Sequence, residues 1–135
     1  MNSLIFRRGY KNWKTTYRVE INFEYTADLE KRLTDVTLHQ LDINRSVTIP
    51  WSIFRSYLDG DEDGIYADAS GLTIRTVDEG ILVSDSRFLN ILIHRDQMEA
   101  IKRAAKNVRE DISESVERIL REFTTHKVPS RYGSG

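Results

Sequence analysis

A change of hydrophobic period near His94 constrains the fold of this chain more than any other feature. Residues 88–93 are almost wholly apolar and β-prone, whereas apolar side chains recur every three or four positions after residue 95. The helical stripe comprises Met98, Ile101, Ala105, Val108, Ile112, Val116, Ile119, Leu120 and Phe123. The sequence predicts a strand that runs directly into a long helix, or into a helical hairpin if Asp111 and Glu114 form a capping box.

Residues 17–25 alternate strictly between apolar and polar side chains, which is typical of a strand in an antiparallel sheet with one buried face. Further strands are predicted at 36–43, 47–49, 72–77, 81–83 and 88–93, a short helix or wide turn at 27–33, and a helix opening at Trp51 after Pro50. We expect a bulge between Leu38 and Leu41, where the alternation changes phase. The last strand is apolar on both faces, which favours a central position in the sheet or in a subunit interface.

The expected fold class is α+β: a mainly antiparallel sheet of about five to six strands, covered on one face by helices, with a C-terminal helical hairpin or long helix. The 135 residues suit one hydrophobic core. We therefore expect a single domain over residues 1–124 and a flexible tail over 125–135, where proline, glycine and serine gather. The lack of cysteine and of an export signal predicts a cytoplasmic protein.

Two segments of the chain share a spacing. Val47 and Ile49 are followed by an aromatic pair at 54 and 57, and Ile91 and Ile93 are followed by Met98 and Ile101 at the same offsets. Both segments would be strands that lead into a helix. The match is short, so it is only a weak indication of an internal duplication.

Charge is nearly balanced overall, with 20 basic and 21 acidic residues, but it is unevenly distributed. Residues 1–18 contain no acid, and their basic residues alternate with aromatic rings, a combination typical of single-strand nucleic-acid binding. The candidate nucleic-acid-binding residues are Arg7, Arg8, Tyr10, Lys11, Trp13 and Lys14. The alternative is an edge strand whose rings enter the core and whose cations are merely solvated.

The acidic stretch 59–68 begins like a calcium-binding loop. Asp59, Asp61 and Asp63 occupy its first, third and fifth positions, but Ser70 stands at the twelfth, where such a loop needs a bidentate glutamate. A solvated acidic turn is the alternative. We expect no metal site, or at most weak calcium binding, and no cofactor.

Parts of the chain resemble two groups of nucleic-acid-binding proteins. The stretch NILIHRDQMEAIKRAA, followed by SESVERILREF, resembles the strand and two helices of ribbon-helix-helix DNA-binding repressors, which implies a dimer that reads DNA through paired strands. Positions 88, 90 and 92 would be its reading side chains, although Phe88 and Leu92 cannot hydrogen-bond a base edge. A broader shape analogy, strands running into a helix with a hint of duplication, resembles the whirly and Pur-repeat single-strand binders.

No catalytic signature is present. His39, His94 and His126 lie far apart in the sequence, and the chain has neither a glycine elbow around serine nor a phosphate-binding glycine loop. We therefore predict a non-enzymatic nucleic-acid-binding or regulatory protein that acts as a homodimer. The residues expected in the dimer interface are Ile91, Ile112, Val116, Ile119, Leu120 and Phe123. The alternative is a protein-interaction module, such as an adaptor, inhibitor or assembly subunit, that works through a sheet edge or the acidic 59–68 loop.

Overall fold

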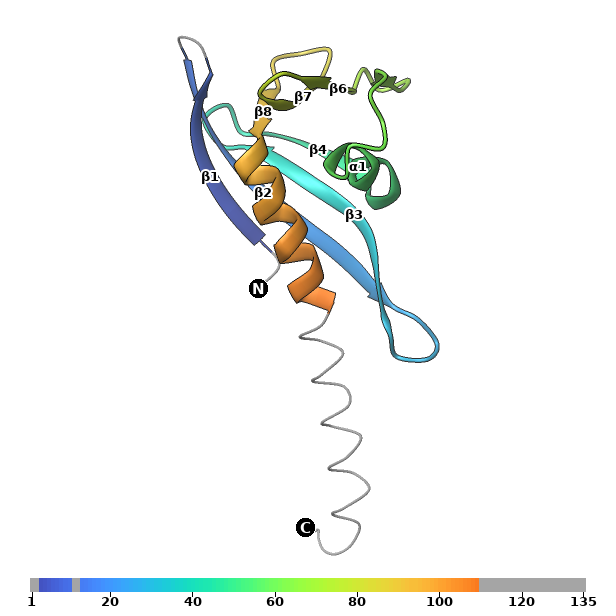
Figure 1. The fold of residues 1–135 in the computed structure, drawn as a ribbon. Coiled ribbons are helices and arrows are strands. Elements are labelled where there is room, and N and C mark those ends of the chain that lie inside the picture. The colour runs from blue at the N-terminus through green and yellow to red at the C-terminus, as the bar shows by residue number, and fades with distance from the viewer. Residues whose placement is uncertain (1–2, 11–12, 110–135) are drawn as a thin grey trace, which may run out of the picture.

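The computed structural model describes residues 3–10 and 13–109, in which four strands and a helix occur twice in succession (Figure 1). The first set is β1 (Ser3–Tyr10), β2 (Trp13–Tyr25), β3 (Lys31–Gln40), β4 (Arg45–Pro50) and α1 (Trp51–Leu58). The second set is β5 (Tyr66–Ala67), β6 (Thr73–Val77), β7 (Gly80–Ser84), β8 (Asn90–His94) and a helix over residues 95–109.

The strands form two antiparallel four-stranded sheets, in the orders β1-β2-β3-β4 and β5-β6-β7-β8. The predicted α+β class and antiparallel pairing are confirmed, but the prediction of one sheet with five to six strands is wrong. Helix α1 and the acidic turn separate β4 from β5, so the later strands pair among themselves instead of extending the first sheet.

The shared spacing of the two segments corresponds to equivalent places in the structure. Ile49 near the end of β4 and Ile93 in β8 are both fully buried. In each case a helix begins at the residue that follows the strand. Phe54 and Met98, each the fourth residue of its helix, are also buried. The described residues therefore contain a repeated structural unit of four strands and a helix.

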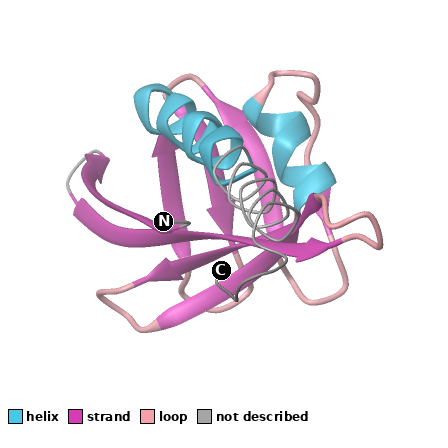
Figure 2. Cartoon of the chain, turned by 90° about the horizontal axis from the view of Figure 1, so that it is seen from below, coloured by secondary structure: helices cyan, strands magenta, loops and turns pink. Residues whose placement is uncertain are grey.

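The core joins the first sheet, the second sheet and the helices in one cluster of buried side chains. The inner face of that sheet contributes Tyr17, Val19, Ile21, Val36, Leu38 and Ile49, all fully buried. Figures 1 and 2 show the helix of residues 95–109 lying over this face. Its predicted stripe, Met98, Ile101, Ala105 and Val108, is buried in the same cluster. Because these side chains are buried within one chain, this part of the stripe belongs to its core. Burial of a side chain such as Ile101 stabilises the fold by about 1.5–3 kcal/mol.

Helix α1 begins at Trp51, as predicted. Pro50 precedes it with φ −54° and ψ 139°, an extended conformation that leads into the first turn without needing an N–H donor. Phe54, Tyr57 and Leu58 are buried, and the helix packs against β3 and β4.

The β2–β3 connection is a turn, one of the two predicted alternatives, but it is shorter than predicted. Residues 26–30 form a tight turn in which the amide N–H of Thr26 bonds the Glu30 carbonyl at 2.8 Å, and Leu29 adopts a left-handed φ of 64°. Strand β3 starts at Lys31, inside the range expected to be helical or a wide turn. Because the turn closes through its own backbone bonds, no helical turn forms.

The predicted bulge is also misplaced. The register between β2 and β3 shifts opposite Asn22 and Phe23, where β3 has the extra residue Thr34, whereas from Asp35 to Gln40 the pairing runs without a further shift. Leu41 and Ile43 fall out of phase because they lie in the β3–β4 turn, where they are 40% and 38% exposed.

Strand β8 lies at the edge of its sheet, so the expected central position is wrong. Ile91 and Ile93 are nevertheless fully buried, and Leu92 is 5% exposed. β8 contacts β2 of the first sheet, and Ile91 and Ile93 belong to the same core cluster as that sheet and the helices. Its apolar character is explained within one chain.

Candidate nucleic-acid interface

Four parts of the chain lie at one end of the molecule, which we call the loop end. They are the end of β1 at Tyr10 with the start of β2 at Trp13, the turn of residues 41–44, and the loops of residues 68–72 and 85–89 (Figure 1). In an antiparallel sheet alternate connections lie at the same end, which places the first two together. The other two join them through contacts between the sheets.

The two later loops have the same local design. Asp68 Oδ1 accepts hydrogen bonds from the amides of Ser70 at 2.9 Å and Leu72 at 3.3 Å. Asp85 Oδ1 accepts the equivalent bonds from Arg87 at 2.9 Å and Leu89 at 3.0 Å. An aspartate that bonds amides two and four residues ahead rigidifies a loop through its own side chain.

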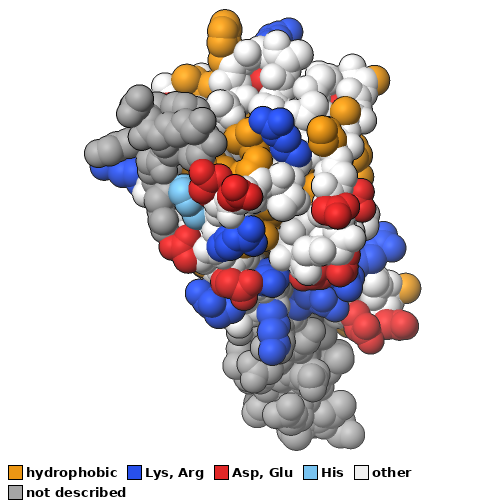
Figure 3. Space-filling model, turned by 45° about the horizontal axis from the view of Figure 1, so that its top comes forward, with side chains coloured by type: hydrophobic (Ala, Val, Ile, Leu, Met, Phe, Trp, Pro, Cys, Tyr) orange, Lys and Arg blue, Asp and Glu red, His pale blue; other side chains and the backbone are white. Residues whose placement is uncertain are grey.

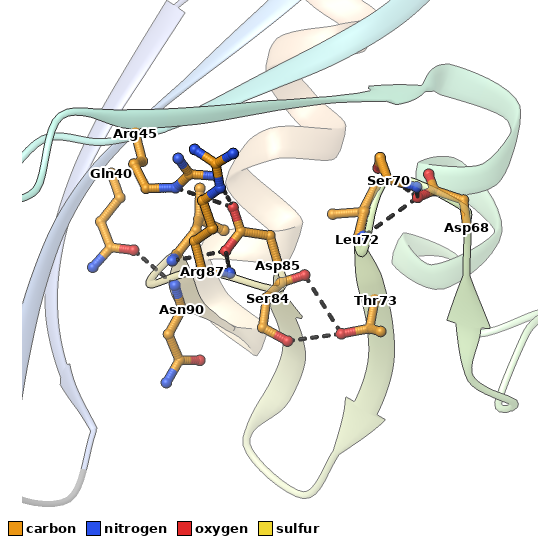
Figure 4. A network of polar contacts seen from close by, with 11 residues as sticks. Gln40, Arg45, Asp68, Ser70, Leu72, Thr73, Ser84, Asp85, Arg87 and Asn90 are labelled. Carbon is orange, nitrogen blue, oxygen red and sulfur yellow. Dashed lines mark hydrogen bonds and ion pairs between the residues drawn. The ribbon is translucent and has the colours of Figure 1, made fainter.

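The loops lie side by side, as Figure 4 shows. A Cβ added to Gly71, which has φ +93°, would stand 2.6 Å from Ser86 Oγ, so only glycine permits this approach. The hydroxyls of Thr73 and Ser84, at the bases of the two loops, are 2.7 Å apart. The Ser70 hydroxyl bonds the Asp68 carboxylate and, with the loop amides, lowers the pKa of Asp68.

An ion pair fastens the second sheet to the first at the loop end. Arg45, at the start of β4, binds Asp85 through Nη2 and, at 3.1 Å, through Nε. The Asp85 side chain is only 5% exposed, and its burial works to raise its pKa. Hydrogen bonds from Arg45 and from the Arg87 and Leu89 amides outweigh that effect, so the pKa of Asp85 is lowered.

A second bond crosses the same junction. The buried Gln40 side chain, at the end of β3, accepts the backbone N–H of Asn90 at 2.8 Å through Oε1. β8 therefore starts from a fixed point on the first sheet. The loop of residues 85–89 is anchored on both sides, and its tip is held in place.

That tip exposes an aromatic ring beside a cation. Phe88 is 81% exposed, the neighbouring Arg87 is also exposed, and Leu41 and Ile43 add apolar surface on the adjoining turn. Figure 3, which brings this end forward, shows hydrophobic side chains standing out from the surface with basic side chains among them. An exposed ring is a platform for base stacking, and a guanidinium at its side suits a phosphate.

The predicted basic residues lead to the same end. Arg7 is exposed on β1. In the backbone register Arg8 pairs with Thr15, and Tyr10 pairs with Trp13 at the hairpin tip. Lys11, and the side chains of Arg8, Tyr10, Trp13 and Lys14, lie outside the described part of the structure, so whether the Trp13 ring faces the core stays open.

No protein-family model, curated protein or solved structure matches this chain. The interface therefore rests on its own geometry. Sequence reasoning missed Arg45 and Arg87. Phe88 is predicted in a strand, as a reading side chain of the ribbon-helix-helix resemblance, but the strand begins at Asn90 and Phe88 lies on the loop before it. The signal for a loop was present in Asp85 with Leu89 four residues on, which repeats the spacing of Asp68 and Leu72.

His39 lies on the outer face of the first sheet. Its Nδ1 is 2.6 Å from Ser46 Oγ on β4, and its Nε2 is 3.4 Å from Glu20 Oε1 on β2. This row of three side chains runs across three strands on an open sheet face. It ties the strand register together through polar side chains.

The acidic turn after α1 has its own partners. Asp59 Oδ2 accepts a hydrogen bond from Arg55 Nε at 3.3 Å, and the Tyr57 hydroxyl donates to the Gly64 carbonyl at 2.9 Å. Within residues 3–10 and 13–109, no three histidine or carboxylate side chains come together as a metal-binding group. The weak calcium candidate Asp59, Asp61 and Asp63 stays a sequence prediction.

Most of the predicted dimer residues cannot be placed. Ile91 is buried inside the chain itself, and Ile112, Val116, Ile119, Leu120 and Phe123 lie outside the described residues, as does the second helix of the ribbon-helix-helix resemblance. β8, the strand of that resemblance, pairs with β7 in the same chain. No helix in the described ranges is both long enough and apolar enough to cross a membrane.

Proposed function

We propose that this protein binds single-stranded nucleic acid at the loop end and acts as a non-enzymatic regulator. The observation that carries the proposal is that β1 and β2, whose segment has basic and aromatic residues without acids, reach the same end of the molecule as a rigid loop that exposes Arg87 and Phe88. Cations bind phosphates in any sequence, and exposed rings stack on unpaired bases.

Single strands fit the site better than duplexes. Phe88 stands on a loop tip held by the Asp85 hydrogen bonds, and a ring at such a tip reaches a base only where the base is not already stacked in a helix. Among the described residues, neither helix lies in the connections of the loop end, so no helix is placed there to enter a major groove. The repeated unit of four strands and a helix supports the analogy with whirly and Pur-repeat binders.

Fluorescence anisotropy with labelled single-stranded and duplex DNA and RNA, repeated over a salt series, tests the proposal. We expect single strands to bind more tightly, with an affinity that falls as salt rises because phosphate contacts release counterions. An affinity that is independent of salt, or no binding to any of these probes, would contradict it and favour the protein-interaction module.

Charge reversal locates the site. Arg87→Glu should weaken binding and reduce the salt slope by about one contact. Arg32→Glu is the matched control, because Arg32 is an exposed arginine of the first sheet near its opposite end, where it pairs with Glu24. Equal losses in both variants would mean that binding follows overall charge and not this surface.

The hairpin is tested separately. Replacing Arg7, Arg8, Lys11 and Lys14 with Glu should abolish binding and leave the fold intact. Trp13→Ala should weaken binding by about 1–3 kcal/mol per stacked base at unchanged melting temperature. If Trp13 instead lies in the core, its truncation lowers stability by roughly 3–5 kcal/mol and the hairpin has no stacking role.

A further inference from the structure

Strand β1 is an edge strand of the first sheet. It lies at the end of the order β1-β2-β3-β4, and within the described residues only β2 pairs with it. Its eight residues would extend about 27 Å. Every residue from Ser3 to Tyr10 keeps register with β2, so no bulge interrupts the strand, and it contains no proline.

Natural proteins usually protect such an edge with a bulge, proline, lysine or covering segment. Between Ser3 and Phe6, β1 carries no charge at all. It also carries Ile5, which is 66% exposed on the outer face of the sheet, next to Arg18 of β2. An exposed aliphatic side chain on a long open edge is typical of a surface that pairs with another strand.

We propose that two copies of this chain associate through β1, in antiparallel pairing about a two-fold axis at Ile5, to form one continuous eight-stranded sheet. The inference is independent of the proposed nucleic-acid function. It places the dimer contact on β1 and not on Ile91, which the chain already buries.

The side chains of β1 select this register. Directly opposed residues in a sheet point to the same face, so a two-fold axis perpendicular to the sheet must pass at a residue. With the axis at Ile5, the two Ile5 side chains oppose each other on the outer face. Leu4 opposes Phe6 on the inner face, where both already pack against the core, and Arg7 opposes Ser3.

Neighbouring registers fit less well. An axis at Arg7 would oppose two arginines, and like charges directly across a ladder destabilise it. An axis at Phe6 would set Arg7 against Ile5, and one at Leu4 would set Ser3 against Ile5. Among the axes from Leu4 to Arg7, only the one at Ile5 covers this exposed side chain with an apolar partner.

Pairing of this kind fixes the geometry of the assembly. The two β1 strands run in opposite directions, so the loop ends of the two copies point away from each other. A dimer would therefore present two separate sites and not one enlarged site.

Cysteine cross-linking tests the register, since the native chain has no cysteine. Opposed residues have Cβ atoms about 4.5–5.5 Å apart, near the spacing of a disulfide. Under a mild oxidant we expect Ile5→Cys to form a covalent dimer. Arg7→Cys alone should not, because the two Arg7 positions would be roughly 13 Å apart along the strands. A mixture of Ser3→Cys and Arg7→Cys should cross-link.

Sedimentation of the unmodified protein should show a dimer at micromolar concentration, and Ile5→Arg should shift it to monomer. Thr48→Arg is the control, because it adds the same charge at an exposed position on the outer face of β4, at the opposite edge. A monomeric native protein overturns the proposal. So does a dimer that cross-links through Arg7→Cys and not Ile5→Cys, or one that survives Ile5→Arg with its fold intact.

Discussion

Arg45 and Asp85, forty residues apart, form the ion pair that joins the two sheets at the loop end. The pair places the loop of Arg87 and Phe88 against the β3–β4 turn. Because Asp85 also accepts two amide bonds from its own loop, one carboxylate determines both the shape of the loop and its position.

Asp85 should make stability depend on acid pH. Its pKa is lowered in the folded protein, so its contribution is present above the unfolded pKa of about 4 and is lost as pH falls through the folded pKa. Asp85→Asn keeps an oxygen for the amides but removes the charge. We expect a loss of about 1.5–3 kcal/mol at pH 7, measured by denaturant unfolding, and a flatter stability curve below pH 4.

The exposed Arg55–Asp59 pair provides the control for this prediction. Asp59→Asn should change stability by less than about 1 kcal/mol, because solvent screens a pair on the helix surface. If both substitutions have the same small effect at every pH, the Asp85 carboxylate does not hold the sheets together.

Gly80 should tolerate no side chain. It has φ +155°, and a Cβ added there would stand 2.0 Å from the Ile93 carbonyl oxygen of the neighbouring strand. Gly80→Ala should therefore force β7 and β8 apart and lower stability by at least about 2 kcal/mol. Thermal melting checks this against Gly60→Ala, where φ is +76° but no atom lies within 4 Å, so that only backbone strain of about 1 kcal/mol applies.

Local pattern predicted the elements of this fold, and non-local pairing decided the rest. The alternation in β2, the proline before α1 and the helical stripe after His94 each depend on residues close in sequence, and the structure has all three. The division into two sheets depends on which hairpins pair with each other, and no local pattern in the sequence predicts that pairing. Arg45 and Asp85 likewise show no common signal in the sequence, so the candidate interface emerged only from the fold.

The acidic turn should bind calcium at best in the millimolar range. Asp59 already pairs with Arg55, and Ser70 at the twelfth position supplies no bidentate carboxylate. Titration calorimetry should show no saturable heat at micromolar calcium, and Asp61→Asn should leave the melting temperature in calcium unchanged. A micromolar site that Asp61→Asn abolishes would mean that the fold supplies further oxygen ligands.

Phe88 should contribute to binding and hardly at all to stability. Its ring is 81% exposed on a loop that hydrogen bonds from the Leu89 and Arg87 amides already hold, so Phe88→Ala removes little buried area. We expect the melting temperature to stay unchanged and the affinity for single strands to fall by about 1–3 kcal/mol, the value of one stacked base. The loss should persist at high salt, because stacking, unlike phosphate binding, releases no counterions. Leu29→Ala is the control, since Leu29 is 48% exposed in the β2–β3 turn, at the opposite end of the first sheet. If the Phe88→Ala variant and the native protein have equal affinities for single strands, the Phe88 ring is not part of the interface and the cations alone bind the nucleic acid.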